Sequence, residues 1–108
     1  MVAGMKLLLT GGRGYIGGRL AQSLSGQGAV PRLASRRHES PPDWLPVAET
    51  VKVDWDSMGS LKDACVGQEA VVHLAGLNAQ GCAADPVNAL MANGVYTARL
   101  LEAAIAQG

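Results

Sequence analysis

The chain has 108 residues, 48% of them hydrophobic, which suits one folded domain. Its nine basic residues balance nine acidic ones, which excludes an overall electrostatic field that attracts nucleic acid or an anionic membrane. No apolar stretch reaches the roughly 20 residues of a membrane span, and the N-terminal apolar run is too short for a signal peptide. Cys65 and Cys82 stand without a Cys-x-x-Cys motif or a His/Cys cluster, which argues against a zinc site or a disulfide framework and favours a reducing, cytoplasmic location.

The first predicted elements are a strand, a helix and a second strand. Residues 6–10 form an apolar run without alternation, which is typical of a strand buried in a parallel sheet. Apolar residues at helical spacing then predict a helix of about three turns that ends near Gly26. Residues 30–35 predict the second strand, and the three prolines within residues 38–47 predict a surface loop.

The second half of the chain continues this alternation. Residues 50–53 predict a third strand, residues 57–66 a short helix and residues 70–75 a fourth strand. Asp85 and Pro86 predict the start of a long helix, because an acid suits the N-cap and proline suits the first helical position. The residues that mark one face of this helix are Val87, Leu90, Met91, Val95, Ala98, Leu101 and Ile105. Strands that alternate with helices indicate a parallel α/β sheet with right-handed crossovers.

Glycines cluster between the first predicted strand and the first predicted helix. Residues 10–17, Thr-Gly-Gly-Arg-Gly-Tyr-Ile-Gly, satisfy both G-x-G-x-x-G and G-x-x-G-x-x-G. In a dinucleotide site one such glycine turns the chain, one lets the pyrophosphate approach the backbone, and one lets the helix pack close to the strand. The N–H groups at the start of the helix then hold the phosphates. The candidate residues are Gly11, Arg13, Gly14, Tyr15, Ile16 and Gly17.

The context of the glycine loop predicts a Rossmann-type α/β fold, here a partial one of about four parallel strands with helices on both faces. The loop of phosphate-loop NTPases is rejected, because it needs Lys-Ser/Thr after its last glycine and Gly18-Arg19 stands there instead. A glycine-rich turn without a ligand is the alternative. For Arg13, contact with the pyrophosphate and exposure to water both stay open.

Basic residues stand where the second predicted strand ends, at Ser35, Arg36 and Arg37. NAD-binding domains usually place an acid about 20 residues after the glycines to hold the ribose 2′-hydroxyl, and here the first acid, Glu39, lies past the strand. Two guanidiniums and a hydroxyl suit a 2′-phosphate through charge-assisted hydrogen bonds. The sequence therefore predicts NADP as the cofactor, with NAD as the alternative. Solvated loop charges are the alternative role of the two arginines.

These motifs resemble the N-terminal part of the extended short-chain dehydrogenase/reductase superfamily, and within it the NAD-dependent epimerase/dehydratase family of nucleotide-sugar enzymes. Residues 10–17 resemble the T-G-x-x-G-x-x-G loop of the family, and Val53 with Asp54 resembles its V-D pair. Residues 71–76 resemble its V-x-H-L-A-A strand end, and residues 93–104 resemble its N-x-x-G-T-x-x-L-L-E-A-A helix.

The resemblance implies further site residues. It places Asp54 at the adenine amino group, and it places Leu74, Ala75 and Gly76 beside the ribose and nicotinamide. Trp55, which follows Asp54, is a further candidate cofactor-binding residue. A turn or helix cap is the alternative role of Asp54, and a packing anchor is the alternative role of Trp55. His73, on the fourth predicted strand, is expected to pack under the following helix.

The chain departs from the family pattern in two places that matter. Tyr96 stands where the family usually has Gly before Thr97. Catalysis in the family uses a Tyr-x-x-x-Lys pair with a Ser/Thr, and the sequence contains no such pair. No residue is therefore assigned as catalytic, and Asn93 alone matches a supporting Asn that helps to fix a water or a backbone kink near the active site.

The resemblance implies that residues 1–108 are the N-terminal part of an NAD(P)-binding domain, with the catalytic Tyr/Lys region and the substrate domain outside this chain. The parent protein is then expected to be a homo-oligomeric NAD(P)-dependent epimerase, dehydratase or reductase that acts on a nucleotide-sugar. The alternative is a non-catalytic dinucleotide-binding module of the same superfamily, with a redox-sensing or regulatory role.

Overall fold

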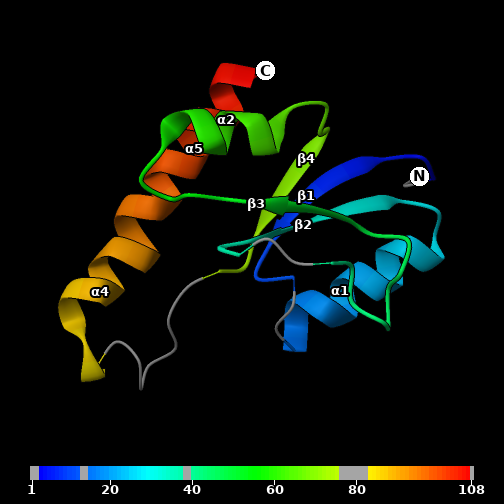
Figure 1. Ribbon diagram of the computed structural model, residues 1–108, viewed down its shortest axis with the longest axis horizontal. Coiled ribbons are helices and arrows are strands. Elements are labelled where there is room, and N and C mark those ends of the chain that lie inside the picture. The colour runs from blue at the N-terminus through cyan, green and yellow to red at the C-terminus, as the bar shows by residue number, and fades with distance from the viewer. Residues whose placement is uncertain (1–2, 13–14, 38–39, 76–82, 108) are drawn as a thin grey trace.

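The computed structural model describes residues 3–12, 15–37, 40–75 and 83–107, and its strands form a four-stranded parallel sheet in the order β3-β2-β1-β4 (Figure 1). The strands are β1 (Lys6–Thr10), β2 (Val30–Ser35), β3 (Glu49–Lys52) and β4 (Ala70–His73). The helices are α1 (Tyr15–Gly26), α2 (Met58–Cys65), α4 (Pro86–Leu90) and α5 (Tyr96–Gln107), with a π-helical turn, η1 (Met91–Val95), between the last two. The strands and helices follow one another along the chain in the predicted order.

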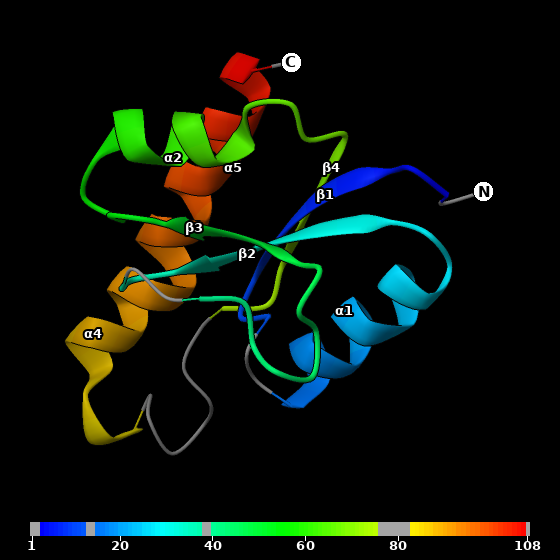
Figure 2. The ribbon, with the colours of Figure 1, turned by 45° about the vertical axis from the view of Figure 1, so that its right-hand side comes forward.

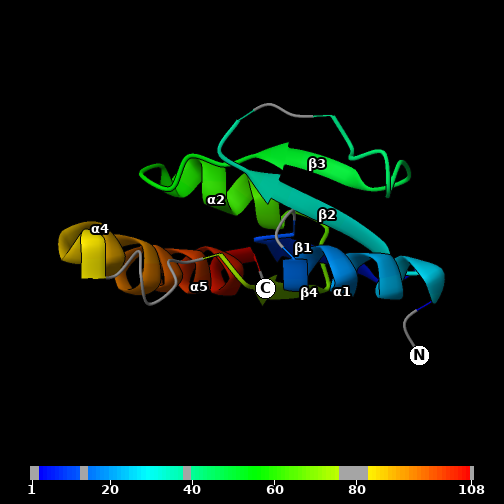
Figure 3. The same cartoon turned by 90° about the horizontal axis from the view of Figure 1, so that it is seen from below.

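Apolar side chains of β1 divide between the two faces of the sheet, because successive residues of a strand point to opposite sides. Leu7 and Leu9 belong to a buried cluster with Ala21 of α1, whereas Leu8 belongs to a buried cluster with residues of α2 and α5. Accordingly, α1 lies on one side of the strands, and α2 and α5 lie together on the other (Figures 2 and 3). The predicted Rossmann-type sheet with helices on both faces is therefore confirmed for the described strands.

The last predicted helix differs from expectation in continuity and in the face that it buries. The Tyr96 amide donates to the Met91 carbonyl, a bond across five residues that closes the π turn between α4 and α5. The predicted apolar face is largely exposed, at Val87, Leu90, Leu101 and Ile105, whereas the buried positions are Ala89, Leu100 and Ala103. A π turn holds more residues than an α turn, so a face counted at α-helical spacing loses its phase there. No helix in the described part of the chain is long and apolar enough to cross a membrane.

Element ends fall within two residues of their predicted positions. Ser57 caps α2, because its hydroxyl oxygen accepts a hydrogen bond from the Ser60 amide at 3.1 Å. The carboxylate of Asp85 caps α4 in the same way through the Asn88 amide, as the sequence predicts. The fourth strand stops at His73 rather than Ala75, because the Ala75 amide donates to the side-chain oxygen of Thr10 instead of extending the ladder.

Candidate functional site

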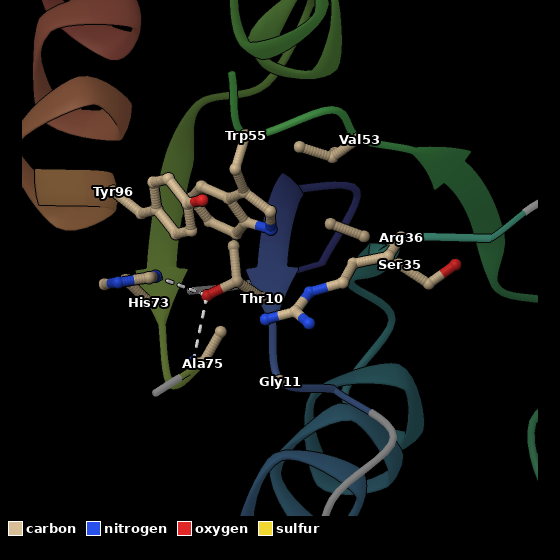
Figure 4. A pocket seen from close by; sticks show the side chains of 10 residues that line it. Thr10, Gly11, Ser35, Arg36, Val53, Trp55, His73, Ala75 and Tyr96 are labelled. Carbon is tan, nitrogen blue, oxygen red and sulfur yellow. Dashed lines mark hydrogen bonds between the residues drawn. The ribbon is translucent and has the colours of Figure 1, made fainter. Parts of the chain in front are cut away.

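A cavity lies where the carboxyl ends of the parallel strands meet, the edge at which ligands of such sheets bind. Thr10 and Gly11 line it from the end of β1, Ser35 and Arg36 from the end of β2, and His73 from the end of β4 (Figure 4). An adjoining cavity shares part of this lining and extends past the end of β3 to Asp54 and Asn88. The residues that line both cavities are Arg36, Val53, Trp55 and Tyr96.

The glycines at the end of β1 are required by the close approach of three backbone segments. Gly11 has a φ of +71°, and a Cβ atom there would lie 2.7 Å from the Leu74 carbonyl carbon and 2.8 Å from the Ala75 amide nitrogen. A Cβ atom on Gly17 would meet the carbonyl oxygen of Gly11. One glycine thus turns the chain and another lets α1 pack against the loop, which are two of the three steric roles expected of the motif.

The first turn of α1 continues this loop. Tyr15 and Ile16 are exposed there, at 77% and 71% of their surface, so both side chains stay accessible beside the glycine loop. The candidate residues Arg13, Gly14 and Gly76 lie outside the described residues.

The three predicted phosphate ligands at the end of β2 take different positions. The Ser35 hydroxyl donates to the Arg37 carbonyl at 2.6 Å, so it closes a turn and points away from the aromatic rings of the cavity (Figure 4). Arg37 is exposed and lines neither cavity. Arg36 extends toward the Thr10–Gly11 end of β1 (Figure 4), and its guanidinium forms no hydrogen bond or ion pair with the described residues.

Asp54 and Trp55 follow β3; Asp54 lines the adjoining cavity, and Trp55 lines both cavities. The Asp54 carboxylate accepts a hydrogen bond from the Asp56 amide at 3.0 Å, so its alternative role in a turn is present, while the helix cap belongs to Ser57. Trp55 packs against His73 and Tyr96, with ring centroids 5.8 and 5.6 Å away. The ligand roles of Asp54 and Trp55 stay predictions.

Tyr96 is a site residue that the sequence does not predict, since it stands out there only as a departure from the family pattern. The π turn ends at Val95 and brings Tyr96, the first residue of α5, to the wall of both cavities. Asn93 lies within the same π turn, where the backbone departs from α-helical geometry, and its carbonyl accepts the Thr97 hydroxyl at 3.4 Å. The signal in the sequence was the large aromatic residue next to Thr97.

A chain of hydrogen bonds through His73 joins β1, β4 and α5 below the aromatic rings. The Thr10 side-chain oxygen accepts from the Leu74 and Ala75 amides at 3.1 and 3.2 Å, so its proton is directed to Nδ1 of His73, 2.5 Å away. Nε2 of His73 then carries the proton and donates to the Thr97 hydroxyl at 2.8 Å. His73 therefore packs against the following helix, as expected, and the network fits only its neutral form.

Acidification is expected to lower the stability of the fold because of His73. Burial lowers the pKa of His73, so below its ordinary value of about 6.5 the unfolded chain binds more protons than the folded one. The contribution of His73 to the free energy of unfolding should be constant above about pH 6.5 and should decline as the pH drops toward the folded-state pKa. Urea unfolding at several pH values measures this slope. His73→Gln should remove it, whereas His38→Gln, the same change at the other histidine, should retain it; equal slopes in both variants would count against the assignment.

Comparisons with known proteins agree with this fold. A sequence model of the NAD dependent epimerase/dehydratase family matches residues 7–108. A search of curated protein sequences finds no match to the chain. Among solved structures, an epimerase from Methanothermobacter thermautotrophicus is 29% identical with a TM-score of 0.83, over 99% of this chain and 33% of that chain.

Two further solved structures contain bound ligands. MoeE5, in complex with UDP-glucuronic acid and NAD, is 29% identical with a TM-score of 0.80, over 95% of this chain and 33% of that chain. A variant of uronate dehydrogenase from Agrobacterium tumefaciens, complexed with NAD, is 26% identical with a TM-score of 0.73, over 98% of this chain and 38% of that chain. The chain thus spans 33–38% of the length of these three proteins.

Proposed function

The chain belongs to the NAD dependent epimerase/dehydratase family, and we propose that it is the cofactor-binding part of an NAD(P)-dependent epimerase, dehydratase or reductase that acts on a nucleotide-sugar. The observation that carries the proposal is the cavity at the carboxyl ends of β1, β2 and β4. The glycine turn at Gly11 bounds it on one side, and the guanidinium of Arg36, which has no partner among the described residues, bounds it on another. Such a site suits a ligand with several phosphates.

Each part of the dinucleotide has candidate ligands in this proposal. The loop and first helical turn hold the pyrophosphate through Gly11, Arg13, Gly14, Tyr15, Ile16 and Gly17. Asp54 and Trp55 contact the adenine. Leu74, Ala75 and Gly76 lie beside the nicotinamide ribose. When bound, the nicotinamide accepts a hydride from the substrate or returns one.

The substrate and the catalytic groups are proposed from the relatives. MoeE5 was crystallised with UDP-glucuronic acid, and a nucleotide-sugar is the substrate class proposed here. The chain spans about a third of its solved relatives, so we place the general base and its neighbouring cation in the remainder of a longer protein. The residues of this chain then bind and orient the cofactor, and none of them acts as the general acid or base of the reaction.

The cofactor is proposed to be NADP, with NAD as the alternative that the ligands of the two solved relatives favour. Arg36 carries this preference, because its guanidinium has no partner among the described residues and extends into the cavity. A 2′-phosphate would give that cation a bidentate acceptor. The Ser35 hydroxyl donates its hydrogen bond to the Arg37 carbonyl, so Ser35 contributes less to binding of the 2′-phosphate than its position in the sequence suggests.

Replacing Arg36 tests both the site and the cofactor preference. Arg36→Ala should lower NADPH affinity by roughly tenfold to a hundredfold, since a charge-assisted hydrogen bond is lost, and should lower NADH affinity much less, because NADH has no 2′-phosphate. Titration of the fluorescence of each reduced cofactor measures this. Arg37→Ala is the matched variant, and a smaller loss is expected because Arg37 lines neither cavity. Equal losses of NADPH and NADH would refute the NADP assignment, and binding of neither cofactor by the unaltered chain would refute the proposed function.

A further inference from the structure

Two aromatic rings form one wall of the cavities at the carboxyl ends of the strands. The rings of Trp55 and Tyr96 have centroids 5.6 Å apart and planes inclined by 22°, so they are stacked (Figure 4). Both residues line both cavities. We call this pair of rings the aromatic wall.

A single arginine fixes both members of the aromatic wall. The Arg99 guanidinium carbon lies 5.6 Å from the centroid of the Tyr96 ring, a cation–π distance. The same guanidinium donates to the Trp55 carbonyl at 2.9 Å and to the Asp56 carboxylate at 3.0 Å. The His73 ring, tilted by 53°, supports Trp55 from another side. The aromatic wall is therefore ordered before any ligand arrives, which lowers the entropic cost of binding.

The lining of the cavities favours a flat aromatic ligand. Arg36 lines both of them together with the aromatic wall, and its guanidinium is unpaired within the described part of the chain. Aromatic rings and planar guanidiniums both stack on aromatic bases. A purine ring that enters between Arg36 and the aromatic wall finds a stacking partner on each side, whereas a sugar phosphate finds only the cation.

We propose that Tyr96, together with Trp55, is a stacking residue for the purine base of the bound dinucleotide. This inference rests on the proposed function and assigns a base contact to a residue of α5 that lies 41 positions after Trp55 in the sequence. Arg99 is the positioning residue that holds the stack, because it acts through the two rings rather than on the ligand.

The test separates loss of the base contact from loss of the phosphate site. In the full chain, Trp44→Phe leaves Trp55 as the only indole, and quenching of its fluorescence reports binding of ADP-ribose. Tyr96→Leu keeps an apolar side chain without the ring and should weaken ADP-ribose by about tenfold, the effect of one lost base stack. Tyr96→Phe keeps the ring and should keep the affinity. Inorganic pyrophosphate, tested as a competitor, should bind Tyr96→Leu as well as it binds the unaltered chain.

The outcomes distinguish this inference from the proposed function. Unchanged ADP-ribose affinity in Tyr96→Leu would overturn the stacking role and leave the proposed function standing. Equal losses of ADP-ribose and pyrophosphate would also overturn it, because the variant would then have disturbed the loop rather than a base contact. If ADP-ribose fails to bind the unaltered chain, the proposed function itself is wrong.

Discussion

Gly17→Ala is expected to lower the free energy of unfolding by about 3 kcal/mol or more, at or beyond the upper end of the usual cost of overpacking, and to abolish dinucleotide binding. The added methyl group would meet the carbonyl oxygen of Gly11 and would lie 2.9 Å from Cα of Gly12. Both are backbone atoms, so no rotation of a side chain relieves the contact. The first turn of α1 would have to move away from the loop, and its N–H groups would leave the position at which they can hold phosphate. Urea unfolding and titration with NADPH measure the two effects.

The same helix offers a matched control for this prediction. Gly26 ends α1, and a Cβ atom there meets no heavy atom within 4 Å. Gly26→Ala should therefore leave binding unchanged and either leave stability unchanged or raise it by up to about 1 kcal/mol, through the entropy of the unfolded chain. If Gly17→Ala unfolds and binds like Gly26→Ala, α1 does not need its close contact with the loop.

The inner strands could be predicted from the sequence because local chemistry sets their ends. β1 and β2 have the predicted bounds, Lys6–Thr10 and Val30–Ser35, since glycines or a basic turn stop each apolar run. β4 was predicted two residues too long, since its last ladder position depends on the side-chain oxygen of Thr10, 65 residues away from Ala75. Such a tertiary competitor has no local signal in the sequence.

For the last helix, the predicted start is confirmed and the predicted buried face is wrong. Asp85 and Pro86 give a local cap signal, and the structure confirms it. The π turn at residues 91–95 has no equally plain local signal, so the α-helical spacing of apolar residues predicts the wrong face beyond it. As a result, Leu100 and Ala103 are buried in the core, whereas Ile105, which belongs to the predicted apolar face, is exposed.

The candidate site could be predicted in outline and not in detail. The steric needs of Gly11 and Gly17 follow from a motif with known geometry. Which of two adjacent arginines enters the cavity depends on the turn that Ser35 closes, and sequence position alone does not decide it. The aromatic wall joins Trp55 to Tyr96 from different elements, so only the packing of α5 beside the end of β3 reveals it.

Thr10→Val is expected to lower the free energy of unfolding by about 2–5 kcal/mol, because unpaired buried polar groups cost about 1–3 kcal/mol each. Thr10 is 1% exposed, and valine has the same shape without the hydroxyl. The amide of Ala75 and Nδ1 of His73 would lose their partner, and the Leu74 amide would keep only the Thr10 carbonyl. The end of β4 would then be held less firmly against Gly11, so dinucleotide binding should weaken as well.

Thr50→Val is the matched control for this last prediction. Thr50 lies on β3, is only partly buried and makes no side-chain hydrogen bond with the described residues, so the same change should alter stability by no more than about 0.5 kcal/mol. Dinucleotide binding, titrated in both variants, adds a second readout: Thr10→Val should weaken it and Thr50→Val should leave it unchanged. If the two variants unfold at the same urea concentration, the Thr10 hydroxyl does not hold the end of β4, and the hydrogen-bond chain from β1 to α5 would have to be reassigned.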